Sequence, residues 1–317
     1  MAINRDKVDL WKKDVEESVD FFNSWFLSFA PRTFKTARNK ACEQVDAVFE
    51  ATNDVREITA PLLAMAPTMV STLRQMTCPP LARDRLAGLA RLSSTIVKSF
   101  EEGKIPTSKT GRYLPFAESI SSVVQKLLDD DLFPWRRLKA KPTEEQRRRS
   151  ALVVADRLCG SLSDPIIRNE QERRQLTSIR TFLEQHGYRL VRPSLYEKMK
   201  PGEFAFHLNI PVRVAEGNEK KVNIPIDVAI LPMCAKQGDL PVLLEAKSAG
   251  DFTNVNKRRK EEAQKIQQLN LTYGPARVDF VLFLCGYFDS GYLGYEAAEG
   301  IDWVWEHRIE DMERIGL

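Results

Sequence analysis

The sequence predicts a mixed α/β protein, in which a largely α-helical N-terminal half precedes a C-terminal half built on a mixed sheet flanked by helices. First, 317 residues suffice for about two domains of roughly 150 residues. Second, apolar residues in the first half recur every three or four positions, which is typical of helices with one buried face. Third, the second half alternates helix-type with strand-type segments. We therefore expect a helical region over 1–150 and a sheet-based core over 151–317.

The first half is expected to contain five helices. Val8 and Trp11 begin an apolar stripe, and Pro31 is expected to end that helix, because the residue before a proline avoids helical geometry. Pro79 and Pro80 impose a further break. The expected helices cover 8–30, 32–50, 68–76, 81–100 and 116–128.

A basic segment separates the two halves. From Leu132 to Ser150, seven basic residues oppose two acidic ones. This segment is either a solvated linker or a stretch that contacts nucleic-acid phosphates between two domains, and the sequence leaves both interpretations open.

The second half is expected to begin with a helix and continue into a sheet. Asp164 is a good N-cap and Pro165 suits the first helical position, so a helix is expected from there to Gly187. The expected strands cover 188–191, 204–214, 222–231, 242–247 and 278–285, with a polar helix over 256–271.

Composition excludes several classes of protein. Hydrophobic residues make up 43% and charged residues 29%, as in soluble globular chains. No apolar run approaches the ~18 residues of a membrane span, and the charged N-terminus lacks a signal-peptide core, so a cytoplasmic protein is expected. The five cysteines and three histidines are scattered, which favours free thiols over disulfides or a zinc site. The net charge is +3, but Phe288–Leu317 carries −6 and the preceding residues +9, which is compatible with a nucleic-acid partner.

Three charged residues lie in two apolar strand segments, where unpaired charges would be costly. Asp227 lies in the first segment, and Glu245 and Lys247 lie in the second. If the strands form a hairpin centred near Lys236, Asp227 lies opposite Glu245 with β-carbons roughly 5 Å apart. Glu245 and Lys247 are two positions apart and share that sheet face. The pattern predicts two carboxylates and one ammonium group converging on one point.

The facing carboxylates of Asp227 and Glu245 would repel each other unless they share a proton or a cation. A hard divalent ion such as Mg²⁺ accepts oxygen ligands and would suit them. A lysine beside such an ion can orient or deprotonate an attacking water, or stabilise a developing charge. The alternative interpretation is a structural salt bridge between Lys247 and one carboxylate.

Asp227 together with Glu245-Ala246-Lys247 resembles the motif of the PD-(D/E)XK nuclease superfamily. Further segments are similar to the XamI-like restriction endonuclease family, and the resemblance extends over nearly the whole chain. Ile226 separates Pro225 from Asp227, whereas the superfamily motif has them adjacent, a relaxation found in many members. The similar segments are Ser18–Phe22, Cys78–Leu86, Arg168–Leu176, Glu245–Asn254 and Cys285–Tyr292.

The resemblance implies a restriction-endonuclease-like core and a type II restriction endonuclease that hydrolyses both strands of double-stranded DNA with Mg²⁺. Asp227, Glu245 and the carbonyl of Ala246 would hold the ion, and Lys247 would position the attacking water. Glu172 is a candidate additional acid, or else an exposed helix charge. The products would carry a 5′-phosphate and a 3′-hydroxyl. The site would be a palindrome, with GTCGAC, associated with the family's namesake, as the candidate. A palindrome calls for a two-fold homodimer, and a cognate DNA methyltransferase is expected in the same cell.

The segment after Lys247 is the predicted DNA contact. Free amides at a helix start favour phosphate, and four consecutive cations there oppose the usual preference for acids. Arginines among them could also read guanine in the major groove. The predicted DNA-binding residues are Ser248, Asn254, Asn256, Lys257, Arg258, Arg259 and Lys260.

Two other functions stay open. A DNA-repair or junction-resolving nuclease on the same core would cut according to DNA structure rather than at discrete sites. A non-catalytic DNA-binding protein would bind without cleavage, and Asp227→Ala would leave its binding unchanged. Two carboxylates facing DNA phosphates argue against a pure binder, because they would repel its ligand.

Overall fold

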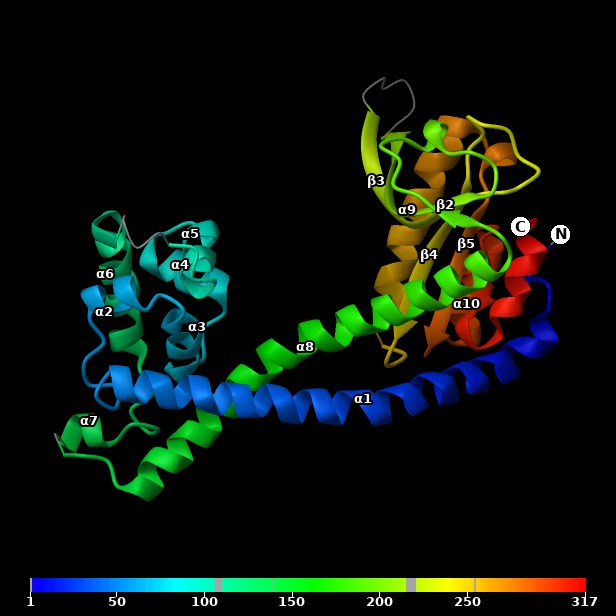
Figure 1. Ribbon diagram of the computed structural model, residues 1–317. Coiled ribbons are helices and arrows are strands. Elements are labelled where there is room, and N and C mark those ends of the chain that lie inside the picture. The colour runs from blue at the N-terminus through cyan, green and yellow to red at the C-terminus, as the bar shows by residue number, and fades with distance from the viewer. Residues whose placement is uncertain (1, 106–109, 139, 215–220, 254) are drawn as a thin grey trace. The chain divides into compact units, whose positions relative to one another are not determined.

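The computed structural model describes residues 2–105, 110–138, 140–214, 221–253 and 255–317, without the side chains of 110 and 255–258. The chain divides into two compact units, one made of Met1–Phe29 with Arg168–Leu317 and the other of Ala30–Ile167. Two long helices, α1 (Val8–Ala51) and α8 (Glu144–Gln185), each contribute to both units (Figure 1). A search of the described residues finds no helix with the length and apolar character needed to cross a membrane.

The beginning of α1 belongs to the unit that contains the sheet, so the division differs from the predicted boundary at residue 150. The rings of Trp11 and Trp303 meet edge to face with centroids 5.5 Å apart. The hydroxyl of Ser18 accepts a 2.8 Å hydrogen bond from the backbone N–H of Gly286. These contacts join segments from opposite ends of the sequence, which local patterns cannot predict.

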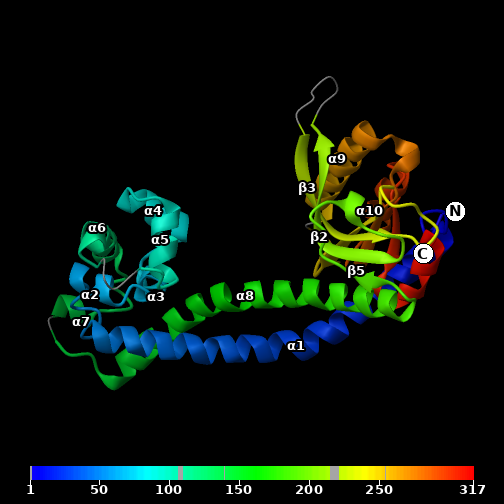
Figure 2. The same ribbon diagram turned by 45° about the horizontal axis from the view of Figure 1, so that its top comes forward.

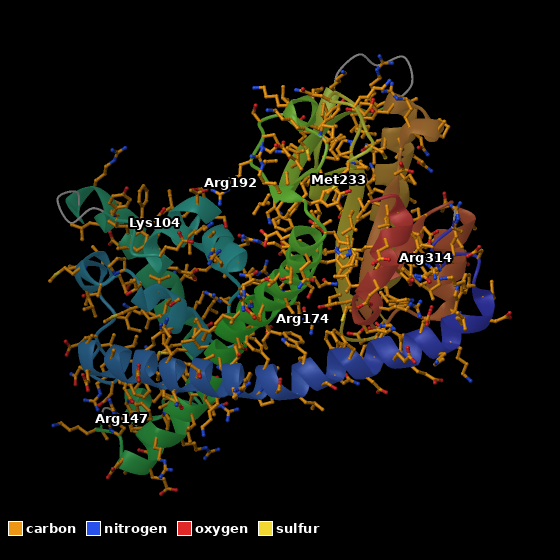
Figure 3. All side chains as sticks on the ribbon, turned by 45° about the vertical axis from the view of Figure 1, so that its right-hand side comes forward. Lys104, Arg147, Arg174, Arg192, Met233 and Arg314 are labelled. Atoms are coloured by element: carbon orange, nitrogen blue, oxygen red, sulfur yellow. The ribbon has the colours of Figure 1, made fainter. Side chains whose placement is uncertain are left out.

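Arg174 of α8, labelled in Figure 3, contacts the beginning of α1 within the same unit. Its guanidinium lies 4.6 Å from the ring centroid of Trp25 and donates a 2.8 Å hydrogen bond to the buried carboxylate of Glu306. A stacked guanidinium and a charged hydrogen bond together stabilise this junction more than either alone.

Pro31 and Pro165 lie inside α1 and α8, so the predicted helix end at Pro31 and the predicted helix start at Asp164-Pro165 are both wrong. A proline removes one helical hydrogen bond and crowds the carbonyl four residues before it. Both prolines are exposed, as is Leu27 one turn before Pro31, so water can solvate the freed groups. The cost is therefore local, and the turns on either side continue as one helix.

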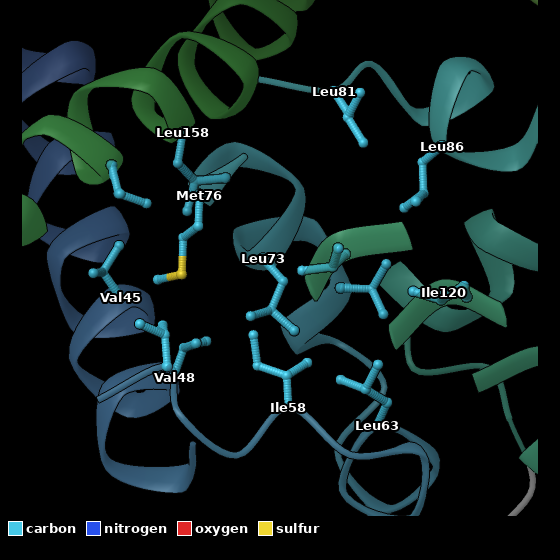
Figure 4. Close-up of a cluster of buried hydrophobic side chains, with 14 of the residues drawn as sticks. Val45, Val48, Ile58, Leu63, Leu73, Met76, Leu81, Leu86, Ile120 and Leu158 are labelled. Carbon is cyan, nitrogen blue, oxygen red and sulfur yellow. The ribbon is translucent and has the colours of Figure 1, made fainter. Parts of the chain in front are cut away.

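The second unit buries one apolar core between the later part of α1 and several shorter helices. Figure 4 shows side chains from distant segments converging there, among them Val45, Leu73, Ile120 and Leu158. Apolar burial of this kind is the main source of stability in a helical unit. The shorter elements are α2 (Ala60–Met65), α3 (Met69–Leu73), the 3₁₀ turn η1 (Arg74–Met76), α4 (Arg83–Ala90), α5 (Ser94–Glu101), α6 (Thr110–Leu127) and α7 (Trp135–Leu138).

The helix predicted over 81–100 is in fact two helices, α4 and α5. Arg91 adopts a left-handed conformation with φ of 55°, which stops α4. Ser93 then caps α5 by accepting the backbone N–H of Ile96 at 3.3 Å. The predicted helices over 68–76 and 116–128 correspond to α3 with η1 and to α6.

The basic segment Leu132–Ser150 is not a solvated linker. Phe133 and Trp135 are fully buried in the core of the second unit. Arg147 bonds the carboxylate of Asp54 at 3.1 Å, so part of the positive charge is compensated inside the unit. The segment lies within Ala30–Ile167 instead of separating two domains, and its contact with phosphates stays a prediction.

Six strands form one mixed sheet in the order β1-β2-β3-β4-β5-β6. Figure 2 labels β2, β3 and β5 of this sheet. The β2–β3 and β3–β4 pairs are antiparallel, and the other three are parallel. This sheet and the helical N-terminal part confirm the predicted mixed α/β class, although β6 was not predicted. The strands are β1 (Arg189–Leu190), β2 (Glu203–Arg213), β3 (Lys221–Leu231), β4 (Val242–Ala249), β5 (Phe280–Gly286) and β6 (Asp302–Trp305).

Helices cover both faces of the sheet. On one face, Phe182 of α8 packs in a cluster with Leu244 of β4. On the other, Leu269 and Leu293 pack in a cluster with Leu243. Successive β4 residues therefore face opposite layers, as strand geometry requires. The second layer consists of α9 (Val255–Tyr273) and α10 (Ser290–Ala298), and 3₁₀ segments lie at Tyr196–Lys198, Pro275–Arg277 and Glu306–Ile315.

Candidate active site

The β3–β4 hairpin positions Asp227 and the segment Glu245–Lys247. Val228 pairs with Leu244, which confirms the predicted strand register. Beyond this pair, Oδ2 of Asp227 accepts the backbone N–H of Ala246 at 2.9 Å. The side chain thus replaces a backbone partner at the point where the two strands lead into the site.

Glu245 is buried between two ammonium groups. Its side chain is 2% exposed, with Oε2 3.0 Å from Nζ of Lys247 and Oε1 2.7 Å from Nζ of Lys265 on α9. Lys265 also donates to the carbonyl of Pro225 at 3.1 Å. A buried carboxylate requires such partners, and the two lysines supply them.

A third acid and a histidine approach Asp227 from α8 and β2. The ligand atoms of Glu172, His207 and Asp227 all lie within 4.8 Å of one another. Nε2 of His207 is 3.9 Å from the carboxylate of Glu172. His207 adopts a positive φ of 52° within β2, a conformation that is costly for a residue with a β-carbon. Outliers of this kind are concentrated at functional sites.

Asp227, Glu172 and Lys247 line an open cavity of about 340 Å³. Gln175 of α8 fixes one wall, because its Nε2 donates to the carbonyls of Lys247 and Phe283, each at 3.2 Å. The lining contains both carboxylates and an ammonium group, so the cavity can accept a phosphate together with a cation. The lining residues are Arg168, Gln171, Glu172, Gln175, Asp227, Ala246, Lys247, Ser248 and Glu261.

Burial and charge shift the pKa values of the two central groups. Burial, and then the nearby charge of Glu245, raise the pKa of Asp227. Burial alone would lower the pKa of Lys247, but the carboxylates of Glu245 and Glu262 outweigh it and raise that pKa. Lys247 is therefore held as an ammonium group, whereas Asp227 lacks full compensation for its negative charge.

The donor set around Asp227 fits a divalent metal ion. Asp227 and Glu172 bring carboxylate oxygens to one point, and His207 brings a ring nitrogen. Carboxylates suit Mg²⁺, and a cation beside Asp227 would oppose the effects of burial and of the Glu245 charge, which raise the pKa of Asp227. Glu245 could join such a site only by giving up part of its contact with a lysine.

The structure brings most of the predicted catalytic residues together. Asp227, Ala246, Lys247 and the additional acid Glu172 line the same cavity, as does Ser248. Glu245 contacts Lys247 but is buried beside it and is not among the lining residues. The catalytic and metal-binding roles of these residues stay predictions.

The predicted DNA-binding helix is described only in part. It begins at Val255, close to its expected start. Arg259 stacks on Tyr295 of α10, with its guanidinium carbon 3.8 Å from the ring centroid, and Lys260 is exposed. Neither is among the residues that line the cavity. Asn254 lies outside the described residues, as do the side chains of Asn256, Lys257 and Arg258.

Sequence reasoning missed several residues at or beside the cavity, among them Gln175, His207, Glu262 and Lys265. The lining residues Arg168, Gln171 and Glu261 were not predicted either. A local signal existed for Gln175, because it lies three positions after Glu172 and so shares its helix face. His207 and Lys265 carry no such signal. Their partners are distant in sequence, and charged residues are common on helices such as α9.

Next to Lys247, α9 and α10 bury a pair of acids. Glu262 and Glu296 are at most 1% exposed, and the hydroxyl of Tyr292 donates to Glu262 at 2.7 Å. Burial, and then the charge of Glu262, raise the pKa of Glu296 to about 8. Two such close carboxyl groups share one proton. The raised pKa of Glu296 favours its protonated form at neutral pH, and Oε1 of Glu262 lies 3.9 Å from the ammonium nitrogen of Lys247.

This acid pair predicts a loss of stability as the pH rises. The folded chain keeps a proton on Glu296 that the unfolded chain releases near its ordinary pKa of 4.5, so the stabilisation is complete below that pH and is lost as the pH rises through about 8. Glu296→Gln keeps the shape of the protonated acid. We expect its thermal unfolding midpoint at a pH of about 9 to exceed that of the unaltered protein by roughly 4 °C or more. Circular dichroism in EDTA measures both midpoints, and an equal decline with pH in both proteins would contradict the expectation.

Comparison with known proteins gives a family and a curated relative. The sequence model of a family described as XamI restriction endonuclease matches residues 53–305. The type II restriction enzyme SalI of Streptomyces albus G is 46% identical over 318 residues, which cover 99% of each chain. No solved structure matches this chain.

Proposed function

The chain belongs to the XamI restriction endonuclease family and is a type II restriction endonuclease, and we propose that it cuts both strands of duplex DNA at GTCGAC in a Mg²⁺-dependent reaction. The observation that carries the chemistry is that Asp227, Glu172 and Lys247 line the same cavity. A cavity lined by both carboxylates and an ammonium group can hold a cation and a phosphate diester together.

Asp227, Glu245 and the carbonyl of Ala246 would hold the ion, with Glu172 as an additional acid. When bound, the ion supplies Lewis-acid polarisation of the phosphate and lowers the pKa of the attacking water. The N–H of Ala246 keeps the Asp227 carboxylate at the cavity wall, with Oδ2 2.9 Å away. Glu245 in turn holds the side chain of Lys247 by their 3.0 Å contact.

Lys247 would orient the attacking water and stabilise negative charge on the phosphate oxygens. The water oxygen forms a bond to phosphorus while the bond to the 3′ oxygen breaks in line, which leaves a 5′-phosphate and a 3′-hydroxyl. The raised pKa of Lys247 favours the ammonium form, so charge stabilisation is its better-supported role.

A palindromic site implies that two copies act together. A two-fold homodimer would place one cavity at each strand. The DNA-binding residues would be Ser248 at the cavity wall together with Asn254, Asn256, Lys257, Arg258, Arg259 and Lys260. A methyltransferase that modifies the same site would protect the DNA of the producing cell.

Cleavage of defined DNA tests this function. Two plasmids that differ only in one GTCGAC site are incubated with the protein and Mg²⁺, and the fragment ends are sequenced. We expect a single linear product from the plasmid with the site and none from its partner, without cleavage in EDTA. Cutting at branched junctions irrespective of sequence would indicate a repair nuclease, and retention of DNA without any cleavage would indicate a pure binder.

A further inference from the structure

Lys247 has a second buried acid beside it, on the helix that follows the active-site strand. Oε1 of Glu262 lies 3.9 Å from Nζ of Lys247, on α9. Glu262 is 1% exposed and is not among the residues that line the cavity, so it would not touch DNA. The carboxylate of Glu262 can affect a phosphate in the cavity through Lys247, which does line it.

A side chain on α10 holds the Glu262 carboxylate in position. Tyr292 donates its hydroxyl to Oε2 of Glu262 at 2.7 Å. Glu296 lies one helical turn after Tyr292, so both side chains occupy the same face of α10, and Glu296 is fully buried. The charge of Glu262 contributes to the raised pKa of Glu296, so the two buried acids are neighbours.

An ion would change the balance of charge around Lys247. Without a cation, the ammonium group contacts Glu245 at 3.0 Å and Glu262 at 3.9 Å. A cation held by Glu245 would compete with Lys247 for that carboxylate, because the divalent charge attracts it more strongly. Glu262 is then the buried acid that keeps the ammonium group in place while DNA is bound.

Stability alone gives no reason for this arrangement. Buried ion pairs contribute little net stability compared with apolar residues of the same volume, because both charges lose their hydration. A second buried acid, Glu296, adds further desolvation cost. Such an arrangement is better explained by an effect on a functional group, here the ammonium group of Lys247.

We propose that Glu262 is a positioning residue for DNA cleavage, which holds the ammonium group of Lys247 at the cavity wall. Tyr292 orients the Glu262 carboxylate by its 2.7 Å hydrogen bond. This inference rests on the proposed function, because it assigns Glu262 a part in the same reaction.

Conservative variants test the role of Glu262. Glu262→Gln keeps the size and removes the charge, and we expect a single-turnover cleavage rate that is lower by about ten- to a hundredfold. DNA affinity measured with Ca²⁺ should change by less than about twofold, because Glu262 is remote from the cavity wall. Glu262→Asp keeps the charge and should recover part of the rate. Tyr292→Phe should also slow cleavage, by a smaller factor, because it removes only the hydroxyl that orients the acid.

The control is Glu299→Gln at the end of α10, which removes an exposed acid and should leave both rate and affinity unchanged. A purely structural role for Glu262 would lower DNA affinity and the unfolding midpoint together with the rate, in both Glu262 variants alike, and would overturn the inference. A fully active Glu262→Gln would overturn it as well, while the proposed function would stand. Failure of the unaltered protein to cut DNA at all would overturn the proposed function and the inference with it.

Discussion

Lys247→Ala is expected to lower the single-turnover rate of DNA cleavage by about a thousandfold, within the range observed for groups that assist proton transfer or charge stabilisation. The residue combines three properties on the described structure: a place on the cavity wall, a 3.0 Å contact with Glu245, and a pKa raised by the surrounding acids. In the proposed reaction, its ammonium group would stabilise the negative charge that develops on a bound phosphate. Removal of that group should therefore slow the chemical step far more than it weakens DNA binding.

The measurement separates chemistry from binding. Single-turnover cleavage at saturating DNA gives the rate, and fluorescence anisotropy with Ca²⁺ gives the affinity. The matched control is Lys236→Ala, which removes an exposed lysine from the turn of the same hairpin. A Lys247→Ala variant that cuts within about tenfold of the unaltered rate would exclude a direct role for the ammonium group. Thermal unfolding checks the fold, because the variant leaves Glu245 and Glu262 with less compensating charge.

Asp227→Asn is expected to abolish cleavage almost completely, by about a thousandfold or more, and yet to raise the stability of the metal-free protein. Loss of a ligand removes metal-ion stabilisation worth several kcal/mol in the transition state. The sign of the stability change follows from the raised pKa of Asp227. The protonated side chain of Asp227 stabilises the folded protein below the ordinary pKa of an aspartate, and this stabilisation is lost as the pH rises through the raised pKa. The ionised side chain therefore destabilises the folded protein at neutral pH. Asparagine carries no charge and avoids this cost.

Three measurements test whether Asp227→Asn loses cleavage and gains stability. Plasmid cleavage gives the rate, isothermal calorimetry with Mn²⁺ reports metal binding without catalysis, and thermal unfolding in EDTA gives the midpoint. Asp239→Asn, in the loop of the same hairpin, serves as the control. A lower midpoint for Asp227→Asn would show that its hydrogen bond to Ala246 matters more than its charge. Unchanged Mn²⁺ binding would remove Asp227 from the metal site.

Much of the local structure around the site could be predicted from sequence. Two apolar segments that carry charged residues predicted β3 and β4, and the assumed hairpin between them predicted a register that the Val228–Leu244 pair confirms. Period-two patterns report directly which face of a strand is buried. The prediction was less accurate for the helices, where Pro31 and Pro165 were taken as boundaries. A single exposed proline removes only one hydrogen bond from a long helix, so it does not have to end it.

By itself, the amino-acid sequence determined the α/β class, the hairpin, and the acid–acid–lysine set of Asp227, Glu245 and Lys247. All of these follow from patterns within a few tens of residues. Only the tertiary structure decided that Glu172 and His207 approach Asp227, that Lys265 pairs with Glu245, and that the first residues of α1 belong with the sheet. The physical reason is that periodicity reveals which face of an element is buried but not which distant element covers it. That choice depends on how all the buried faces of the chain pack together at once.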